Sequence, residues 1–431
     1  MIEFESSRGK TMMAAVVLGI VAVTAGAETS NMVARATPAE TNGPLAGLPS
    51  QPGPTIEKIK ALGDNAWINL GAPAADPKWG KAFGRSWGGK AFAPANEFRG
   101  AFFTGEGMHG FVKPDGYGMD DYWFYDINAH RWICLYPGTD TKNFNRMVAD
   151  KELTVNDLGF VVDRDGQPIP AHLLIHAWGY LAYDDDLKTL AFPASGGFGR
   201  YYMPGEKRID EGLKALDEQR KGRAGKRPVW LYNAMTGKFG ISIPKGTVPG
   251  FQSFGQFLYI GSKKQFFHGS DRGVDFFDPA KGEWTTEKDQ GPRPVGIDFG
   301  GCYDSKRNRV YVRMAGDSWH SYDLKTSTWT KHTVKDITLP GTGSNAAGLH
   351  YDSVNDKVLI IHYATRTIWV YDPEADTWAA PIPFPAEVRG QGNCFYDSTL
   401  GVHFVYMASD STDNGTMWVY RYKTGTGERT K

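Results

Sequence analysis

Cysteine is scarce in this chain of 431 residues: only Cys134, Cys302 and Cys394 are present. Their spacing matches no metal-binding pattern, and an odd number of cysteines cannot all pair in disulfides. Each lies in an apolar, strand-like context, where a free cysteine behaves as a small buried hydrophobe. We therefore expect no metal site, no cofactor and no disulfide framework.

Charge of one sign and long apolar runs are also scarce. The chain has 48 Lys and Arg against 48 Asp and Glu, so its formal net charge is zero. A nucleic-acid partner requires a basic face, and no long Lys/Arg run provides one. The longest apolar run, from Met12 to Ala25, is too short to cross a bilayer comfortably as a helix. We expect no nucleic-acid partner, no membrane span after signal cleavage, and a monomer.

The first residues have the features of an export signal. Arg8 and Lys10 precede the apolar run, and Ala25-Gly26-Ala27 is a small-residue cleavage site. We predict a signal peptide over residues 1–27 and a secreted or periplasmic protein. A retained membrane anchor is the alternative. Residues 28–57 are rich in Ala, Thr, Pro and Gly, which is typical of a flexible linker.

A repeated unit occupies the rest of the chain, in which an aromatic residue and Asp are followed, after five residues, by another aromatic. The copies are Tyr125-Asp126 with Trp132, Phe277-Asp278 with Trp284, Tyr322-Asp323 with Trp329, Tyr371-Asp372 with Trp378, and a weaker Tyr232-Asn233 with Phe239. Successive copies from Asn233 to Arg421 lie 45–49 residues apart, which is the length of a β-propeller blade. We predict that each unit is a hairpin whose Asp accepts backbone N–H bonds in the turn.

A second predicted hairpin precedes each unit and supplies the two inner strands of a blade. Its copies are centred on Tyr183, Tyr259, Tyr303, Tyr351 and Tyr396, and Arg99–Phe103 is assigned as the copy in the first blade. Six blades can be counted, but the last lacks its Trp-bearing strand. A strand containing Trp67 has no blade of its own. Pairing it with the strand of Tyr420 would close the ring and remove exposed sheet edges.

The fold class that follows is all-β: a six-bladed β-propeller of four-stranded blades, closed by an N-terminal strand, over residues 58–431. The small or glycine-containing inner strands and the Tyr-Asp…Trp unit resemble the kelch and galactose-oxidase central-domain family. Its double glycine is present at the aligned position only as Gly300-Gly301. The resemblance implies a propeller architecture, which serves both enzymes and binding modules.

Two insertions interrupt the repeat around blade two, at residues 139–170 and 203–227. Within the second, Glu206 to Lys221 reads as a charged helix with Ile209, Leu213 and Leu216 on one face. Long insertions in a repeat array often form the binding face. The alternative is a solvent-exposed loop whose helix only packs its three apolar residues against the blade. Because blade two carries most of the extra sequence, we expect any special function beside it.

Polar residues just before the inner strands are the predicted ligand-binding set, because innermost strands line the channel of a propeller. They are Arg99, His176, Trp178, Gln252, Asp298, Asn345, Arg389, Gln391 and Asn393. Hydrogen-bonding groups beside an aromatic platform suit a sugar or another small polar ligand. Polar channel walls that only hold water are the alternative.

The leading hypothesis is an exported module that binds carbohydrate or protein at one propeller face. The competing hypothesis is a carbohydrate-active lyase, hydrolase or epimerase that uses His176 and Asp298 for acid–base chemistry. A structural role within a cell-surface assembly is a third possibility. The copper radical chemistry known in the resembled family is disfavoured, because the histidines are scattered and adjacent Cys302 and Tyr303 point to opposite faces of a strand.

Overall fold

The computed structural model describes the propeller and the segment that leads into it. The described residues are 42–85, 91–105, 112–170, 181–193, 209–223, 228–246, 256–270, 273–294, 300–313, 319–335, 337–340, 347–390, 392–408 and 414–425. The predicted signal peptide lies outside these ranges, so its cleavage and the exported location stay predictions. No helix among the described residues is long and apolar enough to cross a membrane.

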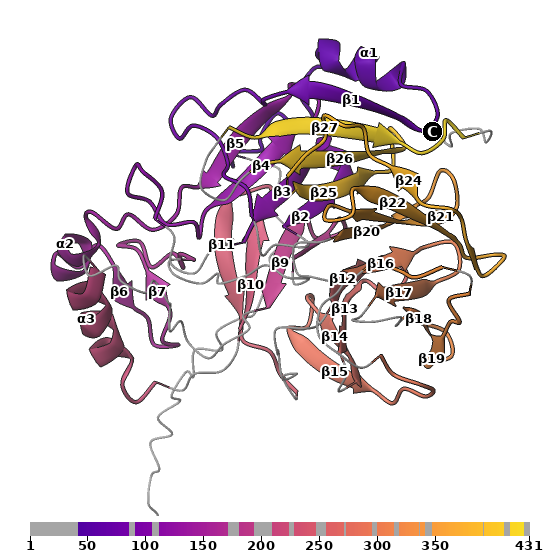
Figure 1. Ribbon diagram of the computed structural model, residues 1–431. Helices are drawn as coiled ribbons and strands as arrows, with labels where there is room; N and C mark the ends of the chain where they lie inside the picture. The colour runs from indigo at the N-terminus through magenta and orange to yellow at the C-terminus, as the bar shows by residue number, and fades with distance from the viewer. Residues whose placement is uncertain are drawn as a thin grey trace, which may run out of the picture. The chain divides into compact units, whose positions relative to one another are not determined.

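Six antiparallel sheets form the blades, as the sequence predicts (Figure 1). Blades one and two are β2 (Phe92–Ala95), β3 (Gly100–Thr104), β4 (Tyr122–Asp126) and β5 (Arg131–Tyr136), then β8 (Ala182–Asp184), β9 (Thr189–Pro193), β10 (Val229–Asn233) and β11 (Lys238–Ser242). Blades three and four are β12 (Gln256–Ile260), β13 (Gln265–Ser270), β14 (Gly273–Asp278) and β15 (Glu283–Glu287), then β16 (Gly300–Asp304), β17 (Arg309–Arg313), β18 (Trp319–Asp323) and β19 (Thr328–Lys331).

The fifth blade carries an extra strand and the sixth is completed from the N-terminal side. Blade five is β20 (Ala347–Asp352), β21 (Lys357–His362), β22 (Thr367–Asp372) and β23 (Thr377–Trp378), with β24 (Ile382–Pro383) also paired to β22. Blade six is β25 (Gly392–Asp397), β26 (Val402–Met407), β27 (Thr416–Arg421) and β1 (Ala66–Gly71). Each innermost strand contacts the innermost strand of the next blade, and β25 contacts β2, so the six blades close into a ring.

The aromatic-Asp unit forms the predicted outer hairpin. Asp323 accepts backbone N–H bonds from Lys325 and Thr326, both at 3.0 Å, and Asp278, Asp372 and Asn233 accept equivalent bonds in their own turns. The two aromatics of each unit pair directly across the hairpin, as Tyr322 does with Trp329 at a ring-centroid distance of 4.9 Å. Local turn chemistry and a cross-strand aromatic pair therefore define each outer hairpin.

Strand β1 closes the ring, because it supplies from the N-terminal side the strand that the second aromatic of this unit occupies in the other blades. Trp67 pairs with Tyr420, and the two ring centroids lie 4.9 Å apart. Asn65 stands two residues before Trp67, has a positive φ of 48°, and accepts the Tyr420 hydroxyl at 3.0 Å. In blade five Asp376, two residues before Trp378, has a φ of 51° and accepts the Tyr371 hydroxyl. The predicted closure is confirmed, and β1 lies along β27 in Figure 1.

The predicted linker over residues 28–57 is wrong for its second half, because residues 42–60 pack onto the propeller. The Gly53 amide donates to the Asn128 carbonyl, and helix α1 (Pro54–Lys60) buries Ile56 and Ile59. Arg421, at the position of the turn-forming Asp in the other blades, donates to the carbonyls of Ile59 and Leu400 at 2.9 Å each. Because no hairpin turn follows β27, this side chain fixes α1 instead.

The assignment of Arg99–Phe103 as the innermost strand of blade one is also wrong. These residues enter β3, the second strand, and the innermost strand is β2. By register, Pro94 takes the place that Tyr303 has in blade four, and Ala95 that of Asp304. Blade one therefore lacks the tyrosine that marks this strand in blades two to six, while Phe102 and Phe103 give an aromatic signal one strand later.

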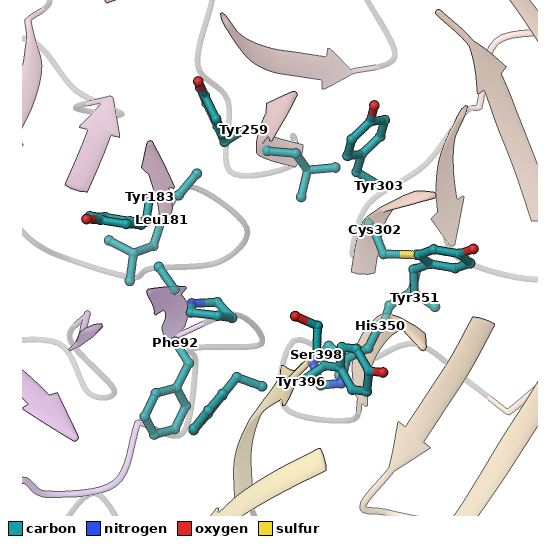
Figure 2. Close-up of a pocket in the computed structure, with 18 of the residues that line it drawn as sticks. Phe92, Leu181, Tyr183, Tyr259, Cys302, Tyr303, His350, Tyr351, Tyr396 and Ser398 are labelled. Carbon is teal, nitrogen blue, oxygen red and sulfur yellow. The ribbon is translucent and has the colours of Figure 1, made fainter. Parts of the chain in front are cut away.

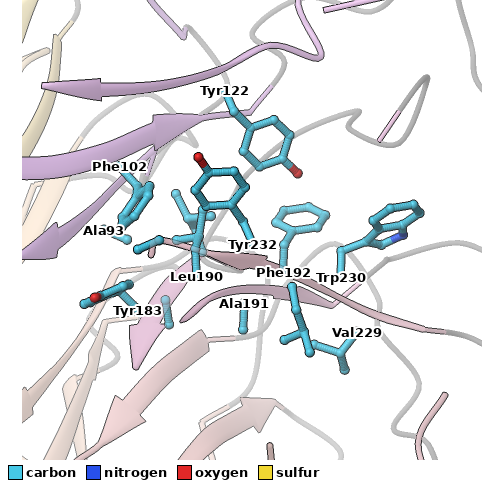
Figure 3. Close-up of a cluster of buried hydrophobic side chains, with 14 of the residues drawn as sticks. Ala93, Phe102, Tyr122, Tyr183, Leu190, Ala191, Phe192, Val229, Trp230 and Tyr232 are labelled. Atoms are coloured by element: carbon cyan, nitrogen blue, oxygen red, sulfur yellow. The ribbon is translucent and has the colours of Figure 1, made fainter. Parts of the chain in front are cut away.

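A large aromatic core joins blades one and two (Figure 3). Phe102 of β3 lies between Tyr183 of β8 and Tyr232 of β10, with ring centroids 5.2 and 5.9 Å away. Such tilted and edge-on contacts are the preferred geometries of aromatic pairs. Packing between blades therefore supports the part of the ring in which the repeat is weakest.

The two insertions pack against each other as one satellite unit. It contains α2 (Phe144–Ala149), β6 (Thr154–Val155), β7 (Val161–Val162) and α3 (Asp210–Arg220), with a small apolar core of its own. Ile209 and Leu216 are buried in that core and Leu213 packs against it, as the predicted helix face requires. An added Cβ on Gly212 would meet the Phe144 ring at 2.8 Å, so α3 approaches α2 closely only because this residue is glycine.

Candidate functional site

A pocket of about 350 Å³ opens at the centre of the ring, where the innermost strands end and turn outward. Residues from all six blades line it, so the site exists only because the ring is closed. Its wall is largely apolar, formed by Phe92, Leu181, Leu258, Cys302, Leu349 and Phe395 among others. Glu97, Asp185 and Ser398 lie at the rim, which gives that edge a negative charge.

Five tyrosines surround this pocket, one at the same strand position in each of blades two to six. We call Tyr183, Tyr259, Tyr303, Tyr351 and Tyr396 the tyrosine ring. Figure 2 shows their hydroxyl groups directed away from the middle of the pocket. The Tyr183 hydroxyl donates to Glu97 at 2.6 Å and the Tyr259 hydroxyl to Asp186 at 2.7 Å. The remaining acceptors are Asn308, Asp356 and Asp352, at 2.8–2.9 Å.

These hydroxyls are structural donors, and those of Tyr183, Tyr259, Tyr351 and Tyr396 remain protonated. Burial first, and then the neighbouring carboxylates, raise the pKa of Tyr183, Tyr259, Tyr351 and Tyr396 far above the usual value. Because each hydroxyl already has an acceptor, the tyrosine ring holds neighbouring turns in place and leaves few polar groups for a ligand. The described end of the channel therefore suits an apolar ligand surface.

A chain of four side chains crosses the pocket wall between blades five and six. The Cys394 sulfur lies 3.6 Å from Nε2 of His350. The Nδ1 atoms of His350 and His403 are 3.1 Å apart, and the two rings are stacked. Nε2 of the fully buried His403 lies 3.8 Å from the Asp352 carboxylate. Thiol, two imidazoles and carboxylate thus form one continuous path that starts at the pocket.

The protons on this path can be assigned from its partners. A hydrogen bond between two Nδ1 atoms needs a proton on one of them only. The Asp352 carboxylate favours the tautomer of His403 that carries its proton on Nε2, so His403 accepts at Nδ1 and His350 donates. Nε2 of His350 then has a free lone pair directed at the Cys394 thiol. Burial alone would raise the pKa of Asp352, but His403, Asn355 and Tyr396 hold it below its usual value.

The Cys394 thiol is protonated at neutral pH. Burial raises its pKa to about 12, although the neighbouring Tyr363 hydroxyl opposes that shift. The sulfur has room only because residue 348 is glycine, since a Cβ there would lie 2.0 Å from it. The arrangement combines a neutral thiol with an imidazole able to accept its proton.

Three of the predicted ligand-binding residues are described, and each has a partner within the protein. Arg99 follows β2 in a left-handed conformation and pairs with the buried Asp397 at 3.1 Å. Asn393 bonds to both the amide and the carbonyl of Arg85 at 3.0 Å. The exposed Arg389 donates to the Ala386 carbonyl. His176, Trp178, Gln252, Asp298, Asn345 and Gln391 lie outside the described residues, so their role stays a prediction.

Asp184, Asp185 and Asp186 bring their carboxylates within 4.8 Å of one another beside the rim. Asp184 accepts the backbone N–H groups of Asp186 and Leu187 within its turn, and Asp186 accepts the Tyr259 hydroxyl. These bonds agree with the interpretation of the segment as a turn. Carboxylates already used in this way give no indication of a cation.

Sequence reasoning missed the tyrosine ring and the Cys394 path as parts of a site. The five tyrosines were used only to align the blades. Their recurrence at one position of the innermost strand could also have indicated a shared place in a site. No comparable signal connects Cys394 with His350, because they lie on different blades and 44 positions apart. Cys302 and Cys394 are buried, as expected, whereas Cys134 is only partly buried, and the three cysteines form no disulfide.

Comparison with known proteins gives no family for this chain. No protein-family model matches it, and no curated protein matches it. Solved structures that align with it include a luciferin-regenerating enzyme (8% identity, TM-score 0.42, 83% of this chain and 95% of that one) and a PQQ-bound aldose sugar dehydrogenase from Streptomyces coelicolor (12%, 0.43, 83% and 98%). A nidogen/laminin complex aligns at 6% identity and a TM-score of 0.38, over 70% and 81%. Such low similarity carries no argument, so the six-bladed β-propeller rests on this chain's own strand pairing.

Proposed function

We propose that this propeller is a binding module whose central pocket takes a small ligand with an apolar body. The observation that carries the proposal is the apolar wall, assembled from all six blades around a cavity of about 350 Å³. Concave, mainly apolar pockets with a few polar groups are the usual form of small-molecule sites. The cavity volume lies within the range of about 300–1,000 Å³ that is usual for small-molecule sites.

An apolar ligand suits this pocket better than a free sugar. Sugar sites combine exposed aromatic faces with several unoccupied hydrogen-bonding groups. Here Tyr183, Tyr351 and Tyr396 are buried, and their hydroxyls are bound to carboxylates. Glu97 and Asp185 at the rim also disfavour an anionic ligand. A carbohydrate or a protein segment, bound at one propeller face, is the alternative ligand.

A fluorescence titration with 2-naphthol as the probe tests the proposal. Ser398 is exposed at the rim, so Ser398→Trp should cover the mouth without disturbing the core and weaken binding at least about 10-fold, or about 1.4 kcal/mol. Thr399→Trp is the matched control, because Thr399 is the next exposed residue and does not line the pocket. Equal binding by both variants and the unchanged protein would exclude the central pocket as the site.

Two further parts of the proposal concern family and location. The Tyr-Asp…Trp unit supports a propeller of the kelch and galactose-oxidase type, and residues 1–27 support export to the periplasm or the medium. Mass spectrometry of the N-terminus of protein recovered outside the cytoplasm tests export. An N-terminus near Glu28 would support it, and an intact Met1 would contradict it.

A further inference from the structure

Cys394 and His350 have the geometry of a nucleophile and its base. Cys394 is a buried residue on the wall of the central pocket, and Nε2 of the half-buried His350 lies 3.6 Å from its sulfur. An activated nucleophile is recognised by a base within reach that is itself oriented by a third group. His403 orients His350 through the contact between their Nδ1 atoms, and Asp352 faces His403 from the other side.

Two features show that this site is built around the sulfur. Only glycine leaves enough space at position 348, because a Cβ added there would lie 2.0 Å from the Cys394 sulfur. The carboxylate of Asp352 is buried and bound by Tyr396 and Asn355, so a negative charge is fixed behind the two imidazoles. When His350 takes a proton, the positive charge that forms is stabilised by that carboxylate through His403.

We propose that Cys394, with His350 as its base, adds reversibly to the carbonyl carbon of a small aldehyde with an apolar body. This inference rests on the proposed function, since the aldehyde must first enter the central pocket. Cys134, on β5 of blade one, does not line the pocket and is the internal comparison.

The step balances without any further reactant. The sulfur lone pair forms an S–C bond to the carbonyl carbon, and the electron pair of the C=O π bond moves to the oxygen. The thiol proton passes to Nε2 of His350 and then to that oxygen, which gives a neutral hemithioacetal. The reverse sequence releases the aldehyde. A protonated thiol with a neighbouring base suits this addition, because the proton need leave sulfur only as the S–C bond forms.

The class of electrophile follows from the walls of the pocket. An aldehyde is neutral, so it meets no repulsion from Glu97 and Asp185 at the rim. It has no leaving group, so the site needs no second acid to expel one. An apolar body on the aldehyde matches the wall formed by Phe92, Leu349 and Phe395.

The test is ¹³C NMR of benzaldehyde, labelled at the carbonyl carbon, mixed with the full exported protein. We expect the hemithioacetal signal with the unchanged protein and with Cys134→Ser, and its complete loss with Cys394→Ser. His350→Gln should form the same adduct about 10²-fold more slowly, since general base catalysis contributes factors of that size. Formation at an unchanged rate in His350→Gln would overturn the role of the base.

Parallel titration with 2-naphthol separates this inference from the proposed function. If 2-naphthol binds all four proteins and no adduct forms with the unchanged protein, the nucleophile is refuted and the binding pocket stands. If neither 2-naphthol nor benzaldehyde occupies the pocket, both are refuted. An adduct of equal size in Cys394→Ser would assign the reaction to another residue. Binding of 2-naphthol by every variant also shows that each substituted protein is folded.

Discussion

Blades three to six and blades one to two form propeller blades by different means. In the first group an inner-strand tyrosine recurs in every blade, and in blades three to five short Asp turns and cross-strand aromatic pairs recur with little variation, as Asp323 and the Tyr322–Trp329 pair illustrate. In the second group, Pro94 replaces the inner-strand tyrosine of blade one, and the satellite unit interrupts blade two. There the ring is held by the aromatic core around Phe102 and by charges buried behind β4. A regular repeat is therefore one route to a stable blade, and packing between blades is another.

The reactive path at Cys394 belongs to the regular part of the ring. The sequence suggested that a special function would lie beside blade two, where the insertions are. The satellite unit instead uses its apolar face to bury its own core, including Phe144 and Leu216. The central pocket draws on every blade, and the thiol, the imidazoles and the carboxylate come from blades five and six.

Closure by β1 should have the largest effect on stability. Deleting residues 58–72 removes β1 and the last turn of α1, so it exposes the edge of β27 and opens the ring. We expect the cooperative unfolding transition to be lost. The measurement is circular dichroism as a function of urea concentration. Trp67→Ala should cost nearly as much as Trp378→Ala, its equivalent in blade five, up to about 3–5 kcal/mol. A much smaller cost at Trp67 would show that β1 is only an accessory strand.

Removing a buried charge from blade one should have the second-largest effect on stability. Asp121 is completely buried between Arg85 and Lys113, and it also accepts the Trp123 indole N–H at 2.7 Å. Asp121→Asn leaves two buried cations without their counter-ion, which should cost about 3–5 kcal/mol of unfolding free energy. Asp150→Asn, in an exposed pair with Arg146, should leave the urea midpoint unchanged. Equal midpoints for the two variants would contradict the role given to this cluster.

The same aspartate sets a pH dependence. Burial by itself would raise the pKa of Asp121, but Arg85 and Lys113 hold it below the usual value. Because the folded pKa is lower than the unfolded one, the carboxylate stabilises the fold above about pH 4. That contribution is lost as the pH falls through the folded pKa. Urea unfolding between pH 3 and pH 7 should therefore show acid destabilisation that Asp121→Asn reduces.

A substitution in the core of the satellite unit should have the smallest effect on the stability of the ring. Leu216→Ala opens a cavity in its core, so local stability should fall by about 2–5 kcal/mol. Limited proteolysis should then cut within residues 139–170, while global unfolding and 2-naphthol binding stay unchanged. Lys214→Ala, on the outer side of α3, is the control. A parallel drop in global stability would show that the ring depends on the insertions.

The architecture could be predicted because its signals are local. An Asp that accepts N–H groups two and three residues ahead, and an aromatic pair across one hairpin, are both written within a few residues of sequence. The same reasoning found β1, since Trp67 had no blade of its own. It failed at β2. Pro94 and Ala95 occupy the positions at which a Tyr-Asp pair was expected, and Phe102 supplies a similar aromatic signal one strand later.

The site was harder to predict because its contacts are distant in sequence. Helix α1 follows a Pro- and Gly-rich segment and depends on Arg421, more than 350 positions away. The pairing of Cys394 with His350 depends on the arrangement of neighbouring blades and on the space beside Gly348. Periodicity fixes which residues share a strand, but it does not fix which side chains from adjacent blades meet at the channel.

Hydrogen–deuterium exchange of the full-length protein, with and without 2-naphthol, tests the central claim most directly. The account predicts slower exchange in the innermost strands β16, β20 and β25 when the probe is bound, and no change in α2 and α3. Protection confined to α2 and α3, with unchanged inner strands, would contradict the assignment of the central pocket as the ligand site.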